Sequence, residues 1–378
     1  MTAKVLLCLC KSRRQGRSVL TSVTTSTALV MAFFFLAVMS PTMHAGKRHW
    51  THQDIQARSQ QIDAFIQERL SKEQIEPALL VDESTLLRRL YLDLIGRIPS
   101  IEEAQSYIDS SDPQKRDQLI NRLLESEGHV SHEYNHWADL LRIKSRMRNL
   151  PGQPYIEWVR NAFRRNMPYD EFVGQLINSK GYLWDDGATG FYFRDAGMEL
   201  DHMANTFQVF LGTQVGCAQC HDHPYDSWTQ KQYYEQAAYT YGVKTTDSKM
   251  NRKFRGLGNN KIRNDIDPAL KAAARRMVRP LKYRVFESKT ALKLPDDYQY
   301  EDSKPKSKVT PHPMFGHLVD GKSDASLRQA YAEWLTSPGN PRFPTVVANR
   351  YWRRMMGVGL IEPVDDMREG VEASHPEL

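Results

Sequence analysis

Cys217, Cys220 and His221 belong to the motif Cys-Ala-Gln-Cys-His, which places two thiols and an imidazole close together in the chain. Two thiols separated by two residues can add to the two vinyl groups of haem, and a histidine directly after the second thiol can bind the iron from one face. The motif therefore predicts covalent attachment of haem c through Cys217 and Cys220, with His221 as the proximal iron ligand.

A second histidine, His223, allows another interpretation of the same segment as a metal site. Zinc binds thiolate, imidazole and carboxylate groups in tetrahedral geometry, and haem attachment does not require this second histidine. The two thiolates and His223 could supply three ligands, and His202 or Asp201 could supply the fourth. Zinc or another divalent metal is therefore the alternative cofactor, with His221, His223 and His202 as its candidate histidine ligands. The protein would then be an exported metal-binding protein or a metal-dependent hydrolase.

Two further roles of the cysteine pair stay open. A redox-active dithiol of the thioredoxin kind would need a β-α-β context, which the surrounding pattern lacks. A structural disulfide would close only a small loop and would leave the neighbouring histidines without a role. This last interpretation describes a surface or scaffold module without catalytic activity.

Helices are expected on both sides of the motif. Met203, Phe207 and Leu211 recur at helical spacing between about residues 201 and 215, and a second helix is expected after Thr229. A haem iron would take its second axial ligand from nearby side chains or keep an open position. The sequence leaves four residues as candidates for that ligand: Met198, His202, Met203 and His223.

The pattern of the whole chain predicts a mainly α fold, with a multi-helix domain, a small β-containing insert and a C-terminal helical segment. Asp82 and Gly96 bound one predicted helix, and Ser100 with Glu103 has the spacing of a capping box that starts the next one. Residues 245–264 are polar and basic and predict an exposed loop. Apolar and polar residues alternate between 281 and 300, which predicts short strands.

The predicted elements divide the 378 residues into four segments. We expect a signal peptide or anchor over residues 1–45 and a helical domain with the cysteine motif over residues 54–245. A linker with a short β segment is expected over residues 246–315. Residues 316–378 are expected to begin a second, truncated domain, with helices starting at Ser326 and near residue 346.

Residues 1–45 have the order of a signal peptide, with basic residues, a Ser- and Thr-rich stretch and then an apolar run over residues 28–39. An apolar run of about a dozen residues fits the hydrophobic region of a signal better than a membrane span. A retained anchor over residues 19–39 is the alternative. Cys8 and Cys10 lie in this segment, so cleavage would leave only the motif cysteines. We therefore expect export to the periplasm or the cell surface.

The charge balance argues against a nucleic-acid partner. The 51 Lys and Arg residues exceed the 45 Asp and Glu residues by six, but five of these positive charges lie within residues 1–45. Nucleic-acid-binding proteins normally carry a clustered basic surplus. The expected partner is an unidentified redox or surface component, and contact with a membrane is expected only through an N-terminal anchor.

Other catalytic signatures are weak. The sequence contains no G-x-S-x-G elbow, no phosphate-binding P-loop and no G-x-G-x-x-G motif. Carboxylates such as Asp93 and Asp139 could in principle serve hydrolysis, but we interpret them as solvated surface groups.

Several short segments carry a family resemblance: residues 88–96 (RRLYLDLIG), 136–140 (HWADL), 166–170 (NMPYD) and 210–224 (FLGTQVGCAQCHDHP). They resemble the planctomycete secreted cytochrome-like type 2 domain, catalogued as domain of unknown function 1549. A second set is similar to the planctomycete secreted domain type 1, domain of unknown function 1553: residues 334–341 (WLTSPGNP), 349–352 (NRYW), 357–360 (GVGL), 365–366 (DD) and 374–378 (SHPEL).

The resemblance implies an exported bacterial protein of planctomycete type, whose cytochrome-like name reflects the cysteine motif. It supplies no reaction, so the haem interpretation depends on the chemistry of the motif itself. Members of the second family continue well beyond the SHPEL segment, which is the reason for expecting a truncated second domain.

Overall fold

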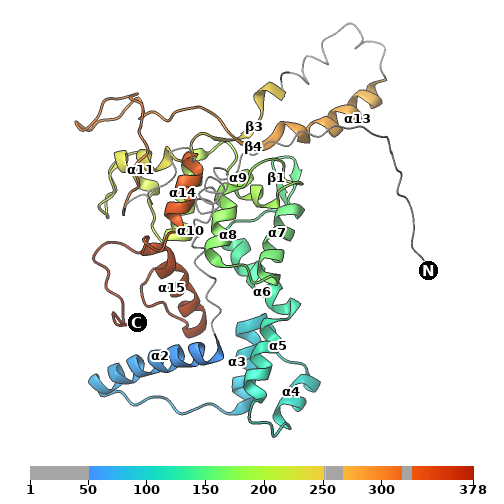
Figure 1. Cartoon of the computed structure of the whole chain (residues 1–378), viewed down its shortest axis with the longest axis vertical. Helices are drawn as coiled ribbons and strands as arrows, with labels where there is room; N and C mark the ends of the chain where they lie inside the picture. Colours follow the sequence, from blue (N-terminus) through green and yellow to red (C-terminus); the bar gives the residue numbers. More distant parts are fainter. Residues whose placement is uncertain (1–50, 251, 253–266, 317–325) are drawn as a thin grey trace, which may run out of the picture. The chain divides into compact units, whose positions relative to one another are not determined.

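The computed structural model describes residues 51–250, 252, 267–316 and 326–378. This part of the chain is mainly α-helical with two small two-stranded sheets, which confirms the predicted fold class (Figure 1). The predicted signal peptide or anchor lies outside the described residues. Within the described ranges, no helix has the length and apolar character needed to cross a membrane.

The helices before the cysteine motif are α2 (His52–Lys72), α3 (Glu83–Ile95), α4 (Ile101–Ile108), α5 (Lys115–Leu124), α6 (Glu127–Leu140), α7 (Gln153–Arg164), α8 (Tyr169–Asn178), η1 (Gly187–Thr189), α9 (Gly190–Arg194) and α10 (Glu199–Leu211). The later helices are η2 (Gly216–Gln219), α11 (Gln230–Ala237), α13 (Pro268–Val278), η4 (Pro280–Lys282), α14 (Leu327–Leu335) and α15 (Arg342–Met356). The strands are β1 (Arg146–Met147), β2 (Leu150–Pro151), β3 (Val243–Thr246) and β4 (Tyr283–Glu287).

The chain divides into two compact units, Met1–Glu76 and Pro77–Leu378. The described part of the first unit contains α2, which begins with a capping box: the Thr51 hydroxyl accepts the Asp54 amide, and the Asp54 carboxylate accepts the Thr51 amide. The other elements named above belong to the second unit, and all the features discussed below lie in it.

Local capping signals place the first helices of the second unit. The Asp82 carboxylate accepts the Thr85 amide at 2.8 Å, and α3 ends at Gly96, which has a φ of 73°. A Cβ at Gly96 would lie 2.4 Å from Nδ1 of His132, so both the left-handed backbone and the packing require glycine. Ser100 and Glu103 form the predicted capping box of α4. The sequence-based predictions of these boundaries are confirmed.

A small hydrophobic cluster joins α3, α4 and α5. Its buried members are Leu87, Tyr91, Tyr107, Leu119 and Leu123. Helix α3 also packs against α6, which carries Trp137 into the main core. Helices α3, α4 and α5 thus pack together and contact the main core through α6.

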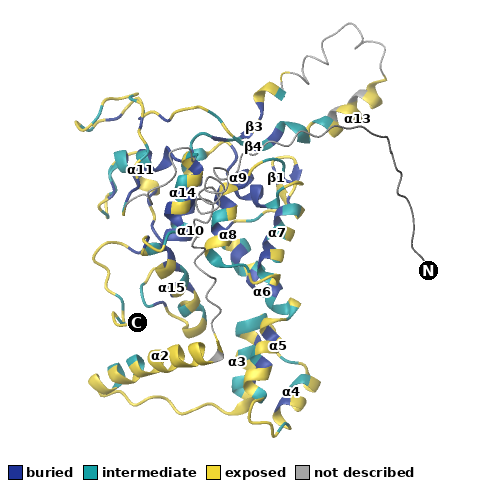
Figure 2. Ribbon diagram, in the orientation of Figure 1, coloured by how far each residue is buried: buried dark blue, intermediate teal, exposed yellow. Residues whose placement is uncertain are grey.

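The main core is one hydrophobic cluster that extends along most of the second unit. It includes Trp137 and Phe207, but also Val285 and Trp334, which lie beyond the boundaries expected at residues 245 and 315. Figure 2 shows buried residues on the helices around α8 and α10, whereas α13 is mostly exposed. Side chains from all the predicted segments of this unit therefore share one core.

The strands β3 and β4 pair in an antiparallel manner, with Val243 opposite Glu287 and Thr246 opposite Tyr283. This pairing confirms that residues 281–300 contain a strand. It also corrects the prediction that an exposed loop begins at Thr245, because Thr245 and Asp247 are only 8% and 7% exposed. Asp247 Oδ2 accepts the Arg284 Nη2 at 2.7 Å. Residues 251 and 253–264 of that predicted loop lie outside the described residues.

Candidate functional site

The cysteine motif forms a short 3₁₀ turn, η2, between α10 and α11. Helix α10 ends at Gly212, where φ is 54°, and the chain then turns into the motif. Within the motif, the amide of Cys220 donates to the carbonyl oxygen of Cys217 at 3.2 Å, and the amide of His221 donates to the same oxygen at 3.4 Å. The predicted position of the motif between two helices is confirmed.

The residues that could do chemistry in this turn are exposed. Cys217 and Cys220 are free thiols, and both are exposed, as is His221. Ala218, between the two thiols, is fully buried. The turn therefore buries Ala218 in the core and leaves Cys217, Cys220 and His221 at the surface.

Asp222, which follows the motif, fixes the exit from the turn. Its amide donates to the hydroxyl oxygen of Tyr300 at 2.7 Å, and its Oδ1 accepts the amide of Gln230 at 2.8 Å. The Gln230 side chain in turn donates to the carbonyl oxygen of Gln219 at 3.1 Å. The motif is thus held from both α11 and the segment after β4.

Tyr233 on α11 connects the motif to α10. Its hydroxyl donates to the carbonyl oxygen of Leu200 at 2.9 Å and to Oε1 of Gln219 at 3.2 Å. The side chain is completely buried, and burial raises the pKa of Tyr233 far above its ordinary value, so the hydroxyl stays protonated. This hydroxyl is a positioning group for the turn.

Replacing Tyr233 with phenylalanine should lower the free energy of unfolding by about 1 kcal/mol, because the ring is kept while buried acceptors lose their donor. We also expect faster amide hydrogen exchange over residues 217–221, measured by mass spectrometry. Tyr225→Phe is the matched control, because Tyr225 is 76% exposed. Equal exchange in the two variants would contradict a positioning role for Tyr233.

His221 has a defined tautomer in this arrangement. Its Nδ1 lies 2.7 Å from the carbonyl oxygen of Asp222, and a carbonyl can only accept a hydrogen bond. Nδ1 therefore carries the proton, and in the neutral ring Nε2 has a free lone pair. A metal-bound histidine commonly uses this arrangement, with one ring nitrogen held by a hydrogen bond and the other free to coordinate.

His223 is held in the opposite way. Its Nδ1 accepts the amide of Tyr225 at 3.2 Å, so this nitrogen uses its lone pair within the loop. In the neutral ring the proton is then on Nε2. The half-buried His223 could bind a metal through Nδ1 only after breaking this hydrogen bond. It could bind through Nε2 only after losing the proton on that nitrogen.

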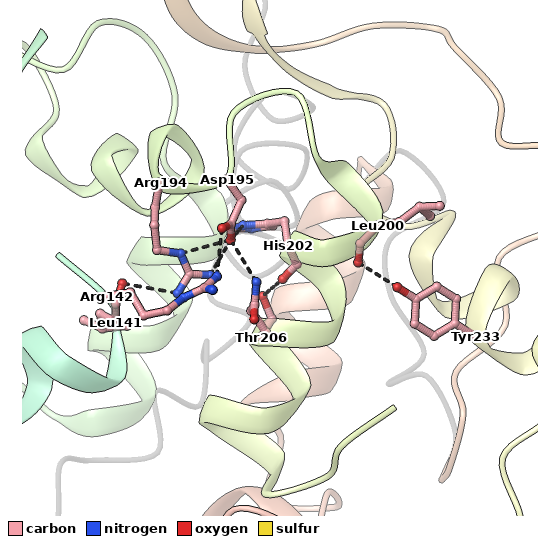
Figure 3. A network of polar contacts seen from close by, with 9 residues as sticks. Leu141, Arg142, Arg194, Asp195, Leu200, His202, Thr206 and Tyr233 are labelled. Atoms are coloured by element: carbon pink, nitrogen blue, oxygen red, sulfur yellow. Dashed lines mark hydrogen bonds and ion pairs between the residues drawn. The ribbon is translucent and has the colours of Figure 1, made fainter. Parts of the chain in front are cut away.

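His202, the third candidate metal ligand, lies on α10 and belongs to a buried ionic network with the end of α9 (Figure 3). The ring is 5% exposed and lies between Phe191 and Tyr192, each with its ring centre 4.6 Å away. Its Nδ1 donates to Oδ2 of Asp195 at 3.3 Å. The structure thus places His202 in the core.

Asp195 is the centre of that network. Its carboxylate accepts Nε of Arg194 at 2.9 Å and Nη2 of Arg142 at 2.8 Å. Burial by itself raises the pKa of Asp195, but the hydrogen bond from His202 and the charge of Arg194 outweigh it and hold the pKa well below its ordinary value. Burial lowers the pKa of His202, which favours the neutral ring. The network therefore stabilises α10, whose Leu200 carbonyl accepts Tyr233 (Figure 3).

The candidate ligands are not gathered in one cluster. Among the described residues, no group of three or more His, Cys, Asp or Glu side chains is arranged to hold a metal ion. Of the other candidates for a second axial haem ligand, Met203 is buried at 1% exposure and Met198 is 49% exposed. The structure brings together Cys217, Cys220 and His221 in one turn and leaves His202 elsewhere in the fold.

Comparison with known families assigns two parts of the chain. Residues 61–245 match the model of PSCyt2, described as a protein of unknown function (DUF1549). The chain carries a PSCyt2 domain. Residues 327–378 match the model of PSD1, described as a protein of unknown function (DUF1553). No curated protein and no solved structure matches the chain.

The PSCyt2 segment contains the complete cysteine motif and most of its supports, including Gln230 and Tyr233. Tyr300 lies outside both matched segments, although its hydroxyl accepts the Asp222 amide. Tyr300 was not among the residues predicted from the sequence, because nothing in its sequence neighbourhood indicates a contact with a residue 78 positions earlier. The capping pattern after Thr229 could have indicated Gln230, since it fixes the first turn of α11 beside the motif.

Proposed function

We propose that this protein is an exported c-type haem protein that carries electrons or provides redox support outside the cytoplasm. Cys217 and Cys220 would hold the haem covalently, and His221 would bind the iron. Export is proposed from the order of residues 1–45, with the periplasm or the cell surface as the destination. The partner would be a redox protein or a surface component.

The observation that carries this proposal is the combination of exposed thiols with the tautomer of His221. Both cysteines are free and exposed, and Nδ1 of His221 donates a hydrogen bond to the Asp222 carbonyl oxygen, so Nε2 is available. These residues fit haem attachment, which needs two accessible thiols and one free imidazole nitrogen from the adjacent residue. A disulfide clip would need neither the exposure nor the orientation of His221.

The haem group, when bound, would supply a one-electron redox centre. The protein's own contribution would be to anchor and orient that group. Buried Ala218 and the bond from Gln230 to the Gln219 carbonyl oxygen fix the turn, and Tyr300 fixes the residue after it. Hydrogen bonds of this kind to ligand-bearing loops tune the ligand and the potential of an iron centre.

Zinc or another divalent metal, bound through the thiolates and His223, is the alternative that the experiment must separate from haem. The hydrogen bond from the Tyr225 amide to Nδ1 of His223 disfavours this histidine as a ligand. The two cofactors differ in absorbance, in covalent attachment and in elemental content, so a single preparation distinguishes them.

The test is expression of the full chain in bacteria that carry a cytochrome c maturation system. Wild-type protein should retain haem on a denaturing gel and give the pyridine haemochrome spectrum of haem c. Cys217→Ser with Cys220→Ser should lose both signals. Cys8→Ser with Cys10→Ser is the matched control and should keep them, because these cysteines lie in the proposed signal peptide.

Exported wild-type protein without covalent haem would overturn the proposal. Elemental analysis of the same preparation then decides the alternative. About one equivalent of zinc without haem absorbance, lost on replacing Cys217, would establish a thiolate metal site.

A further inference from the structure

A cavity of about 460 Å³ lies in the second unit, away from the cysteine motif. Its walls come from α3, the end of α5, α6, the end of α7, the turn that follows it, the start of α8, and α15. It is therefore bounded by both the PSCyt2 segment and the PSD1 segment. A cavity of this size matches the sites that bind small molecules, and none of the cysteines or histidines of the motif lines it.

Four of the segments that carry the family resemblance contribute residues to this cavity. Asp93 comes from residues 88–96, Trp137 from residues 136–140, Tyr169 from residues 166–170 and Tyr351 from residues 349–352, and all four line it. These segments are far apart in the sequence and belong to two families. The proposed haem site accounts for none of them, so the cavity gives them a common location.

Aromatic rings form much of the wall. Trp137 packs against Tyr169 and Phe172 with ring centres 5.6 and 5.7 Å away, and Phe163 and Tyr351 complete the aromatic lining. The Tyr351 hydroxyl donates to Oε2 of Glu133 at 2.8 Å, which fixes this ring at the rim. The π faces of aromatic rings carry partial negative charge and attract cations.

The charged groups of the lining are acidic. Asp93 and Glu133 line the cavity, and no lysine or arginine does. Glu133 is neutralised from behind by Arg354, whose Nη1 lies 2.6 Å from Oε1. The half-buried Asp93 carboxylate forms no ion pair with a described residue. Asp93 therefore supplies an uncompensated negative charge at the aromatic cavity.

Histidines at and beside the cavity affect its hydrogen bonding and its charge. Nδ1 of His129 donates to the carbonyl oxygen of Leu94 at 2.8 Å, which leaves Nε2 of the neutral ring as an acceptor in the lining. Burial lowers the pKa of His132 and of His136, with the charge of Arg354 acting in the same direction, so both favour the neutral form. A ligand with hydrogen-bond donors and a positive charge suits this environment.

We propose that this cavity binds a small organic cation, a protonated or quaternary amine attached to an apolar body. The apolar body would lie against Trp137 and Phe172, and the ammonium group would face the Asp93 carboxylate and the aromatic rings. Desolvated aromatic walls strengthen the attraction for a cation, and a carboxylate at the same site adds a direct charge pair. This binding activity is independent of haem and of the cysteine motif.

The test compares three probes that share a phenyl group and differ in charge: 2-phenylethylammonium, 2-phenylethanol and phenylacetate. Binding to the full chain is measured by titration calorimetry and by ligand-observed NMR at pH 7. The ammonium compound should bind about tenfold more tightly than the neutral alcohol, and phenylacetate should bind most weakly.

Asp93→Asn should remove most of this preference, because the amide keeps the shape of the carboxylate and loses its charge. Asp139→Asn is the matched control, because Asp139 is an exposed residue of α6 outside the cavity lining and carries the same charge. The control should leave the preference unchanged. The proposal is overturned if the alcohol binds as tightly as the ammonium compound, if neither binds, or if Asp93→Asn behaves as the control does.

Discussion

Replacing Asp195 with asparagine is expected to lower the free energy of unfolding by about 3–5 kcal/mol. The variant removes the negative charge from a buried pair, because the side chains of Arg194 and Asp195 are only 2% and 4% exposed. Arg194 would then keep a buried charge without its partner. Arg142 contributes little to this effect, since its side chain is 49% exposed and its ion pair is screened by water.

Urea unfolding followed by circular dichroism measures this loss. Asp170→Asn is the control, because Asp170 is exposed on α8 and a surface charge of this kind should change stability by less than about 0.5 kcal/mol. Adding Arg194→Met to Asp195→Asn should recover part of the stability, since the uncompensated buried charge is then gone. A loss of stability no larger than that of the control would show that the network does not support α10.

The acid dependence of stability provides a second measurement of the same network. The pKa of Asp195 is lower in the folded than in the unfolded state, so its stabilising contribution is complete above the unfolded pKa, near 4. This contribution should be lost as the pH falls from about 4 through the folded pKa. Asp195→Asn should lack that part of the acid-induced loss.

Replacing His221 with alanine is expected to reduce the yield of correctly ligated haem by about tenfold or more. Removing a residue that only orients a metal ligand already lowers metal affinity by about 10–100-fold. His223→Ala should retain the wild-type yield and spectrum. The difference follows from the two tautomers: Nε2 of His221 is free, whereas Nδ1 of His223 already accepts the Tyr225 amide. The two residues are neighbours of the same type and therefore make a matched pair.

The measurement is the ratio of haem to protein from the pyridine haemochrome spectrum, together with the absorbance spectrum of the oxidised and reduced protein. Thermal unfolding of both variants without haem verifies that each folds. Loss of haem in His223→Ala with retention in His221→Ala would reverse the assignment. Loss in both would make His223 a second ligand of the iron.

Much of the helical framework could be predicted because its signals are local. The Asp82 cap, the left-handed Gly96 and the Ser100–Glu103 capping box each depend on groups within a few residues of one another. The same is true of the cysteine motif, whose chemistry follows from the spacing of Cys217, Cys220 and His221. Short-range hydrogen bonds and helical periodicity act within a single element, so the sequence alone expresses them.

The support of the motif could not be predicted in this way. The Tyr300 hydroxyl accepts the amide of Asp222, which lies 78 residues earlier in the chain. Strand β3 pairs with β4 although a long connection that includes α13 separates them. The sequence also left His202 among the metal candidates, whereas packing between Phe191 and Tyr192 and the bond to Asp195 place it in the core. Such contacts depend on many weak long-range interactions, and no local pattern specifies which segments meet.

The sequence by itself thus determined the helical class of the fold, the ends of several helices and the set of residues that we propose attach a haem. The tertiary structure decided that Nε2 of His221 is free whereas Nδ1 of His223 is engaged, which side chains hold the motif, and where distant segments such as those of Asp93 and Tyr351 meet around one cavity. The physical reason is that side-chain chemistry and capping are properties of neighbouring residues, whereas burial, tautomer and cavity walls arise only when remote parts of the chain pack together.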